Sequence, residues 1–332
     1  MTAVSYRRQK VGQFDVFYRE AGPADAPVIL LLHGFPSASH MFRDLIPLLA
    51  DRYRVIAPDL PGFGQTSIVP REAFPYSFDA LAETIDGLVE ALALTRYALY
   101  IFDYGAPVGL RLAMRHPERV SAIISQNGNA YLEGFSDGWG AWQDYWRNPS
   151  DETREACRES LFPDTIRQWQ YGTGTDPELL SPDGYELDIA YMARPGAEEI
   201  QLDLILDYRS NVALYPAFQS YFREARPPLL DLGSRPWIGG DALDDHLPAL
   251  AHHFARALPM TADTGRAVDY AARAGTRALA QLAGDPGLVE PHRHHGAAVV
   301  EDARLDALAA AELIEEPALF IAAADDRPYA AE

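Results

Sequence analysis

Short apolar runs alternate with amphipathic stretches over the first 130 residues. Four apolar-rich runs are the expected strands, at residues 28–32, 53–57, 97–102 and 120–125, the first of them continuously apolar. Unbroken apolar runs of this length are typical of strands buried on both faces of a parallel sheet. Residues 11–20 instead alternate apolar and polar positions, which predicts an edge strand. Helical spacing follows at residues 41–50, 78–94 and 107–115. This order predicts an α/β fold, a mostly parallel sheet flanked by helices.

Composition and charge narrow the function classes. The chain has 332 residues, of which 48% are hydrophobic, enough for one α/β domain with an inserted subdomain. Its formal net charge of −20 argues against nucleic acid and anionic membrane surfaces as partners. Cys157 is the single cysteine, which excludes an internal disulfide. No apolar run approaches the ~20 residues of a membrane span, and no signal-peptide pattern opens the chain. We expect a soluble cytoplasmic protein, with its oligomeric state left open.

Candidate chemistry begins where the strand at residues 97–102 meets the next helix. Asp103 lies at this junction, and a side chain on such a tight turn is presented at the end of the sheet, as in a nucleophile elbow. Gly105 supplies the small side chain that the turn requires, and Pro107 suits a first helical turn. The same segment also fits a plain junction in which Asp103 caps the helix. Taken alone, it does not separate the two interpretations.

Two further motifs accompany this turn. HGFP follows the strand at 28–32, and APDLPGFGQTS follows the strand at 53–57. Together with the aspartate elbow, they resemble the α/β-hydrolase family over residues 10–130, in particular its Asp-nucleophile branch of epoxide hydrolases and haloalkane dehalogenases. The resemblance implies an α/β-hydrolase core over 1–130, a helical cap over 131–226 and an atypical helix-rich C-terminal region over 227–332.

The resemblance also implies roles for the residues of these motifs. Asp103 would attack an electrophilic carbon and form an ester. The backbone N–H groups of Phe35 and Tyr104 would form the oxyanion hole for the hydrolysis of that ester. His33 would shape the loop that carries Phe35 and contribute to substrate binding.

The cap segment is rich in aromatic residues, which suits a small apolar substrate. Trp142 is therefore a candidate substrate-binding residue. The family's epoxide hydrolases use cap tyrosines to protonate the opening epoxide oxygen, and Tyr208 and Tyr215 are the candidates here. A phenol with a pKa near ~10 can donate a proton while staying neutral. For each ring, simple packing in the lid is the competing interpretation.

The resemblance weakens after Arg226-Pro227-Pro228. Alanine becomes frequent, and three stretches have helical spacing, at residues 246–258, 265–282 and 302–313. Asp326 fits the family's acid best, ahead of Asp325 and Asp241. The chain ends before any strand carrying the usual histidine motif, which leaves His294 and His295 as candidates for the base. The region is an insertion, a fusion or a shifted reading frame, and the sequence does not decide among these.

The combined sequence features favour an epoxide hydrolase-like enzyme. Haloalkane dehalogenases place a tryptophan after the nucleophile and often an asparagine after HG, whereas this chain has Tyr104 and Phe35. A haloalkane dehalogenase-type hydrolase remains an alternative, as does a hydrolase-like binding protein that does not turn over. We expect no cofactor, because no glycine-rich dinucleotide fingerprint opens the first strand–helix unit. We also expect no metal, because the histidines at positions 292, 294 and 295 lack matched carboxylate or cysteine ligands.

Overall fold

A seven-stranded sheet forms the centre of the protein in the computed structural model, which describes residues 3–135, 137–173, 177–178 and 180–231. The strands are β1 (Ser5–Val11), β2 (Phe14–Ala21), β3 (Val28–Leu32), β4 (Arg54–Pro58), β5 (Tyr97–Phe102), β6 (Val120–Gln126) and β7 (Leu229–Asp231). Their order is β1-β2-β4-β3-β5-β6-β7, and the five strands from β4 to β7 are mutually parallel. The predicted α/β architecture is confirmed.

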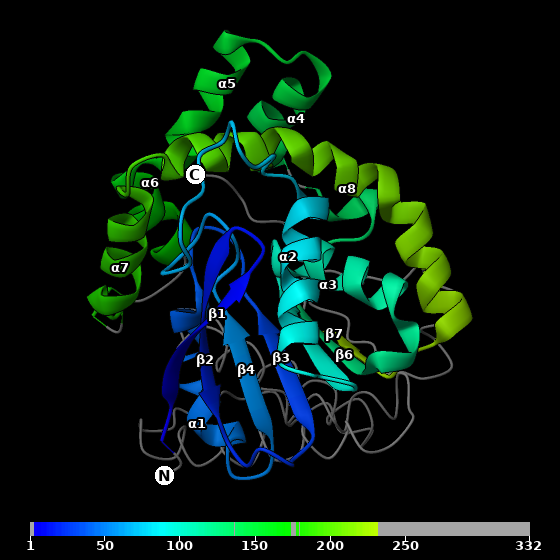
Figure 1. Ribbon diagram of the computed structural model, residues 1–332. Helices are drawn as coiled ribbons and strands as arrows, with labels where there is room; N and C mark the ends of the chain where they lie inside the picture. Colours follow the sequence, from blue (N-terminus) through cyan, green and yellow to red (C-terminus); the bar gives the residue numbers. More distant parts are fainter. Residues whose placement is uncertain (1–2, 136, 174–176, 179, 232–332) are drawn as a thin grey trace, which may run out of the picture.

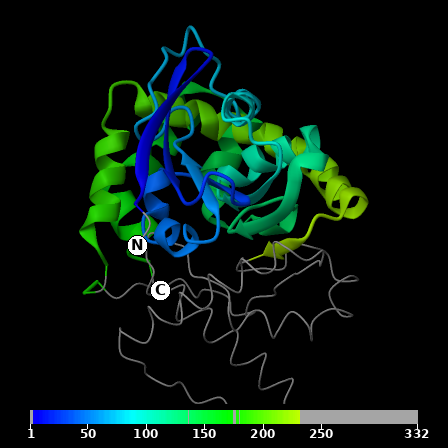
Figure 2. The same cartoon turned by 60° about the horizontal axis from the view of Figure 1, so that its bottom comes forward.

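The antiparallel end of the sheet differs from the prediction. Residues 11–20 were predicted to form an edge strand, but β2 covers Phe14–Ala21 and pairs with β4 as well as with β1. The outer strand is β1, joined to β2 by a tight turn at Gly12, where φ is +54°. Because β1 is largely exposed, its residues carry no apolar pattern to reveal it. Figure 2 shows this dark-blue hairpin and the yellow-green β7 at opposite ends of the sheet.

Helices cover both faces of the sheet. On one face, α2 (Phe78–Ala91) and α3 (Gly105–Arg115) pack over the larger apolar cluster, and η2 (Pro117–Arg119) follows. On the other face, the helix predicted at 41–50 is divided into a 3₁₀ turn, η1 (Ser39–Phe42), and α1 (Leu45–Leu49). Pro47 explains the division, because its ring would clash with the carbonyl of residue 43 in a continuous helix. The parallel pair of Leu32 with Ile101 sets the ends of β3 and β5 side by side.

Helices account for the regular structure described between Leu132 and Ala225, the segment predicted as the cap; its boundaries remain a prediction. They are η3 (Leu132–Gly134), η4 (Asp137–Trp139), α4 (Gly140–Arg147), α5 (Asp151–Cys157), η5 (Arg158–Leu161), α6 (Pro163–Thr165), the π-helix η6 (Ile166–Tyr171), α7 (Pro182–Met192) and α8 (Ala197–Ala225). In Figure 1, α8 arcs over the molecule below α4 and α5 and then descends toward β7. Within the described ranges, no helix has the length and apolar character needed to cross a bilayer.

A buried polar contact joins the predicted cap to the segment that follows β3. His40 Nε2 on η1 lies 3.1 Å from Asp188 Oδ1 on α7, and both side chains are almost inaccessible to solvent. The hydroxyl of Tyr171, the last residue of the π-helix, donates to the other oxygen of Asp188. One carboxylate therefore ties η6 and α7 to the segment that follows β3.

Removal of Asp188 should destabilise the protein strongly. In Asp188→Ala, the buried His40 and Tyr171 lose their partner, and each buried polar group left without a partner costs about 1–3 kcal/mol. Asp183→Ala, in the exposed first turn of the same helix, is the matched control and should change the free energy of unfolding by no more than about 0.5 kcal/mol. Urea unfolding followed by circular dichroism measures both. Equal midpoints for the two variants would contradict an anchoring role.

Candidate functional site

Asp103 occupies a strained turn between β5 and α3. Its φ angle is +47°, in the left-handed region that non-glycine residues rarely adopt. A Cβ atom on Gly105 would lie 2.2 Å from the carbonyl oxygen of Leu32, so this position accepts only glycine. Tyr104 is the cap residue of α3, and no side chain caps the helix. Asp103 therefore does not serve as the helix cap, and its strained backbone has the geometry of a nucleophile elbow.

The two predicted oxyanion-hole donors converge on this residue. The Phe35 N–H donates to Asp103 Oδ1 over 2.7 Å, and the Tyr104 N–H is a second backbone donor to the same carboxyl group. A Cβ atom on Gly34 would lie 2.2 Å from Asp103 Oδ1, so the loop comes this close only because residue 34 is glycine. The structure thus brings together Asp103, Phe35 and Tyr104, whose catalytic roles stay predictions.

The environment of Asp103 makes ionisation of its carboxyl group unfavourable. Burial raises the pKa of Asp103 to about 6, although the hydrogen bonds from Phe35 and Tyr104 act to lower it. No positively charged group among the described residues offsets this burial. Asp103 as a whole residue is of intermediate exposure. At neutral pH, the site holds a carboxylate that is mostly ionised and poorly solvated.

His33 is locked into the loop by its own ring. Nε2 accepts a hydrogen bond from the Leu60 N–H over 2.9 Å, which assigns the proton to Nδ1. Nδ1 then donates to the Gly34 carbonyl over 3.1 Å. The ring is fully buried, and this burial lowers the pKa of His33. Both ring nitrogens of His33 bond within the loop, and its substrate-binding role stays a prediction.

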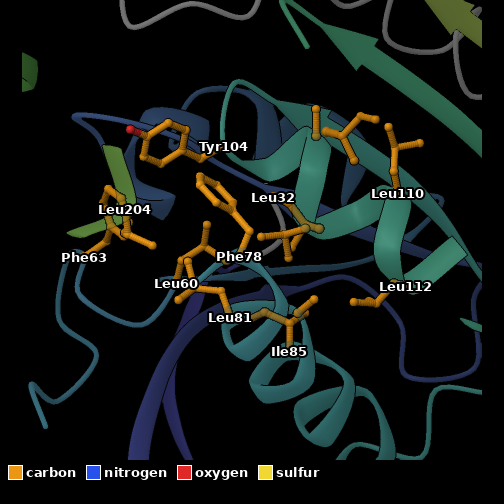
Figure 3. Close-up of a cluster of buried hydrophobic side chains, with 14 of the residues drawn as sticks. Leu32, Leu60, Phe63, Phe78, Leu81, Ile85, Tyr104, Leu110, Leu112 and Leu204 are labelled. Carbon is orange, nitrogen blue, oxygen red and sulfur yellow. The ribbon is translucent and has the colours of Figure 1, made fainter. Parts of the chain in front are cut away.

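Aromatic rings surround the approach to Asp103. The Tyr104 ring packs edge to face on Phe78 at 4.9 Å between centroids, and the two rings lie next to each other in Figure 3. Trp142 is a predicted binding residue. Its ring centroid lies 6.3 Å from that of Phe35 and 6.5 Å from that of Tyr104. The sequence analysis assigned no role to Phe78. The position of Phe78 as the first residue of an amphipathic helix capped by Ser77 was a usable signal.

The two candidate proton donors lie together in this aromatic region. Tyr208 contacts Tyr104 at 5.9 Å and stacks on Trp146 at 5.5 Å. Burial raises the pKa of Tyr208 well above its ordinary value, and the neighbouring Tyr215 and the charge of Asp103 raise it further. Burial also raises the pKa of Tyr215, whose Oη has no hydrogen bond of good geometry within the described residues. Both phenols are therefore neutral at neutral pH.

The remaining candidates fall elsewhere. Asp326, His294 and His295 lie outside the described residues, as do the alternatives Asp325, Asp241 and His292. His116 lies away from the aromatic region, with its Nε2 3.1 Å from Asp86 Oδ1. Among the described residues, no cluster of histidine, cysteine and carboxylate side chains has the arrangement of a metal site.

Comparison with known proteins agrees with the fold and with its motifs. Residues 27–169 match the family model of the alpha/beta hydrolase fold. The "uncharacterized hydrolase YNR064C" of Saccharomyces cerevisiae is 48% identical over 222 residues, which cover 65% of this chain and 75% of the yeast protein. The chain belongs to the α/β-hydrolase family.

Named haloalkane dehalogenases are among the relatives of this hydrolase. A haloalkane dehalogenase of Psychrobacter cryohalolentis is 36% identical over 135 residues, which cover 39% of this chain and 44% of the dehalogenase. The chain thus spans less than half of that relative. The structure of the epoxide hydrolase CorEH superposes with a TM-score of 0.58 at 18% identity, covering 70% of this chain and 82% of CorEH, which supports the fold. The protein is a hydrolase of the α/β-hydrolase superfamily, with haloalkane dehalogenases among its sequence relatives and an epoxide hydrolase of the same fold.

Replacing Asp103 should stabilise this hydrolase at neutral pH. The folded state raises the carboxyl pKa from 3.8 to about 6, so the stability that the group contributes is complete below pH 3.8 and is lost as the pH rises through about 6. Asp103→Asn should therefore raise the free energy of unfolding at pH 7.5 by about 2–3 kcal/mol. Near pH 4 the gain should disappear.

Denaturant unfolding at the two pH values measures this effect, with Asp25→Asn on the exposed loop before β3 as the control. The control should show no such dependence on pH. A helix-capping aspartate would behave in the opposite way, because its loss costs about 1 kcal/mol at neutral pH. A destabilised Asp103→Asn at pH 7.5 would therefore contradict the assignment of an isolated, buried carboxylate.

Proposed function

We propose that this hydrolase acts through Asp103 as a nucleophile on an epoxide or a similar small apolar electrophile, with an alkyl-enzyme ester as the intermediate. The observation that carries the proposal is the meeting of the Phe35 and Tyr104 N–H groups on the carboxyl group of a residue held at a φ of +47°. A strained, half-buried carboxylate aimed from the end of a parallel sheet suits attack on carbon.

The first half-reaction uses groups that lie together around Asp103. One carboxylate oxygen forms a bond to an epoxide carbon, and the bond from that carbon to the epoxide oxygen breaks. The released oxygen takes a proton from Tyr208 or Tyr215. Formation of the ester removes the negative charge of Asp103, which is one cause of the raised pKa of Tyr208. The phenol therefore becomes a better acid as the ring opens.

The second half-reaction cleaves the ester by attack of water on the Asp103 carbonyl carbon. The negative charge then develops on the oxygen that faces the Phe35 and Tyr104 N–H groups, and each such donor is worth on the order of 3 kcal/mol. A general base must accept a proton from the water. His33 is excluded from this role by its two backbone hydrogen bonds. We assign the base to His294 or His295 and the orienting acid to Asp326, as the sequence predicted.

A haloalkane substrate is the second candidate, since curated relatives are named haloalkane dehalogenases. The buried phenol of Tyr208, whose pKa the charge of Asp103 raises, favours the epoxide, because a departing halide requires no proton. Halide release from a chloroalkane, compared with diol formation from an epoxide of the same carbon skeleton, separates the two reactions.

An ester should form on Asp103 and should carry oxygen from water after turnover. Incubation with an epoxide in ¹⁸O-labelled water should place label in the peptide that contains Asp103, as measured by mass spectrometry. The rate of adduct formation should rise about tenfold between pH 5 and pH 7, because ionisation is centred near a pKa of about 6.

Asp103→Ala should form no adduct, and label found only in the diol of an active Asp103→Ala would sink the proposal. A chain whose general base does not reach the ester should instead accumulate an adduct for minutes, since such a base contributes ~10²–10⁴-fold. A persisting adduct would identify the binding-protein alternative. Variants of His294 and His295 would then show which histidine acts in a chain that turns over.

Loss of the cap hydroxyls should slow the opening of the epoxide without unfolding the protein. Tyr208→Phe and Tyr215→Phe keep the buried rings, so their unfolding midpoints should stay close to wild type. General-acid help is worth ~10²–10⁴-fold, and the variant that loses the donor should form the adduct more slowly by such a factor. Tyr185→Phe, a partly buried cap ring on α7, is the control. Wild-type adduct rates in both test variants would reject the role.

A further inference from the structure

Arg111 is a buried cation for which the proposed reaction has no direct use. It lies on α3, its side chain is 4% exposed, and its guanidinium faces the cap helix α8. Nη1 donates to Asn211 Oδ1 over 2.6 Å and to the Pro107 carbonyl over 3.1 Å. Nη2 donates to Ser210 Oγ over 3.2 Å. Arg111 therefore fastens the helix that begins at the elbow to residues 210 and 211 of α8.

A second contact fastens α8 on the other side of Tyr208. Asp207 Oδ2 accepts a hydrogen bond from the Phe78 N–H over 2.7 Å, at the first residue of α2. The same oxygen accepts from Ser210 Oγ over 3.2 Å. Burial raises the pKa of Asp207, while the hydrogen bonds from Phe78 and Ser210 and the charge of Arg111 act to lower it. The residue just before Tyr208 in α8 therefore contacts α2, and residues 210 and 211 just after it contact α3.

Both connections lead back to the candidate site. Helix α3 starts two residues after Asp103, and Phe78 packs on Tyr104 and, at 5.5 Å, on Tyr208. A shift of α8 relative to either helix would change the separation between Tyr208 and Asp103. Reactions that depend on placement lose rate steeply when a donor moves by about 1 Å.

Stability alone does not explain a buried guanidinium at this position. Arg111 Nε makes no hydrogen bond among the described residues, and an Asp79 carboxylate oxygen lies 3.8 Å away. Burying a charge that is incompletely satisfied is costly, and apolar side chains of similar volume often serve packing as well or better. The directed hydrogen bonds to α8 are what an apolar chain would not supply.

We propose that Arg111 and Asp207 are positioning residues that hold the Tyr208 hydroxyl where it protonates the opening epoxide oxygen. The proposal rests on the function proposed above, in which Tyr208 is a proton donor. Arg111 itself touches neither substrate nor Asp103. Its effect on the reaction passes through α8 and therefore requires the hydroxyl of Tyr208.

A double-mutant cycle tests this dependence in the full chain. The readout is the single-turnover rate of Asp103 adduct formation with an epoxide, together with the substrate concentration at half-saturation. Arg111→Met should slow adduct formation about 10- to 100-fold in the wild-type background, with little change in half-saturation. In the Tyr208→Phe background it should change the rate less than twofold. Arg111→Lys, which keeps a donor for Asn211, should recover part of the rate.

Arg115→Met supplies the matched control, since Arg115 lies one turn later on α3 and pairs at the surface with Asp79. Its rate should equal that of its parent in both backgrounds. Asn211→Ala removes the acceptor and leaves Arg111 in place, so it keeps the test available if Arg111→Met does not fold. It should reproduce the same dependence on Tyr208.

The outcomes separate the two proposals. An equal slowing by Arg111→Met with and without the Tyr208 hydroxyl would show a merely structural role and overturn the positioning proposal. A wild-type rate in Arg111→Met, or in Tyr208→Phe, would overturn it as well. Absence of any adduct on Asp103 in the wild-type protein would instead overturn the proposed function.

Discussion

The close approach of the loop after β3 to the turn after β5 is the contact on which the site depends. It places the Phe35 N–H 2.7 Å from the Asp103 carboxylate, and it exists because glycines at positions 34 and 105 leave room for neighbouring backbone and side-chain atoms. The His33 ring holds the loop through hydrogen bonds with the backbone of Leu60 and Gly34. Sheet register, loop and turn therefore act as one unit, and the cap is assembled around it.

The same contact creates an electrostatic conflict. Burial that excludes water from Asp103 raises its pKa, whereas the two backbone N–H groups favour its ionised form. Burial has the larger effect, so the fold is less stable with the charge than without it. Natural proteins tolerate such local costs at functional sites because the surrounding core supplies the stability. The extended apolar cluster beneath the elbow and the buried His40–Asp188 pair belong to that supporting structure.

Local pattern was sufficient to predict much of this architecture. Apolar-rich runs predicted β3, β4, β5 and β6, and the order of motifs indicated the family. Pattern failed for β1, whose residues are mostly exposed, and at residue 47, where a proline overrode helical spacing. It also missed the contacts of Arg111, because their partners at positions 210 and 211 are about a hundred residues away. A local sequence pattern does not reveal contacts over such a separation. His33 carried the right residue type, but only the tautomer set by its neighbours showed that it has no free nitrogen.

The pairing of β3 with β5 also constrains when the site appears during folding. Residues 35 and 103 are 68 positions apart, and they meet only after Leu32 has paired with Ile101 across two parallel strands. Parallel pairing of this kind requires a long loop to close, and the entropy cost of closure comes before the stabilising contacts form. Such pairing therefore forms more slowly than local helices. No isolated fragment around the elbow would keep Asp103 at positive φ. Asp103 thus acquires its positive φ and its hydrogen bond from Phe35 only in a chain whose central strands have paired.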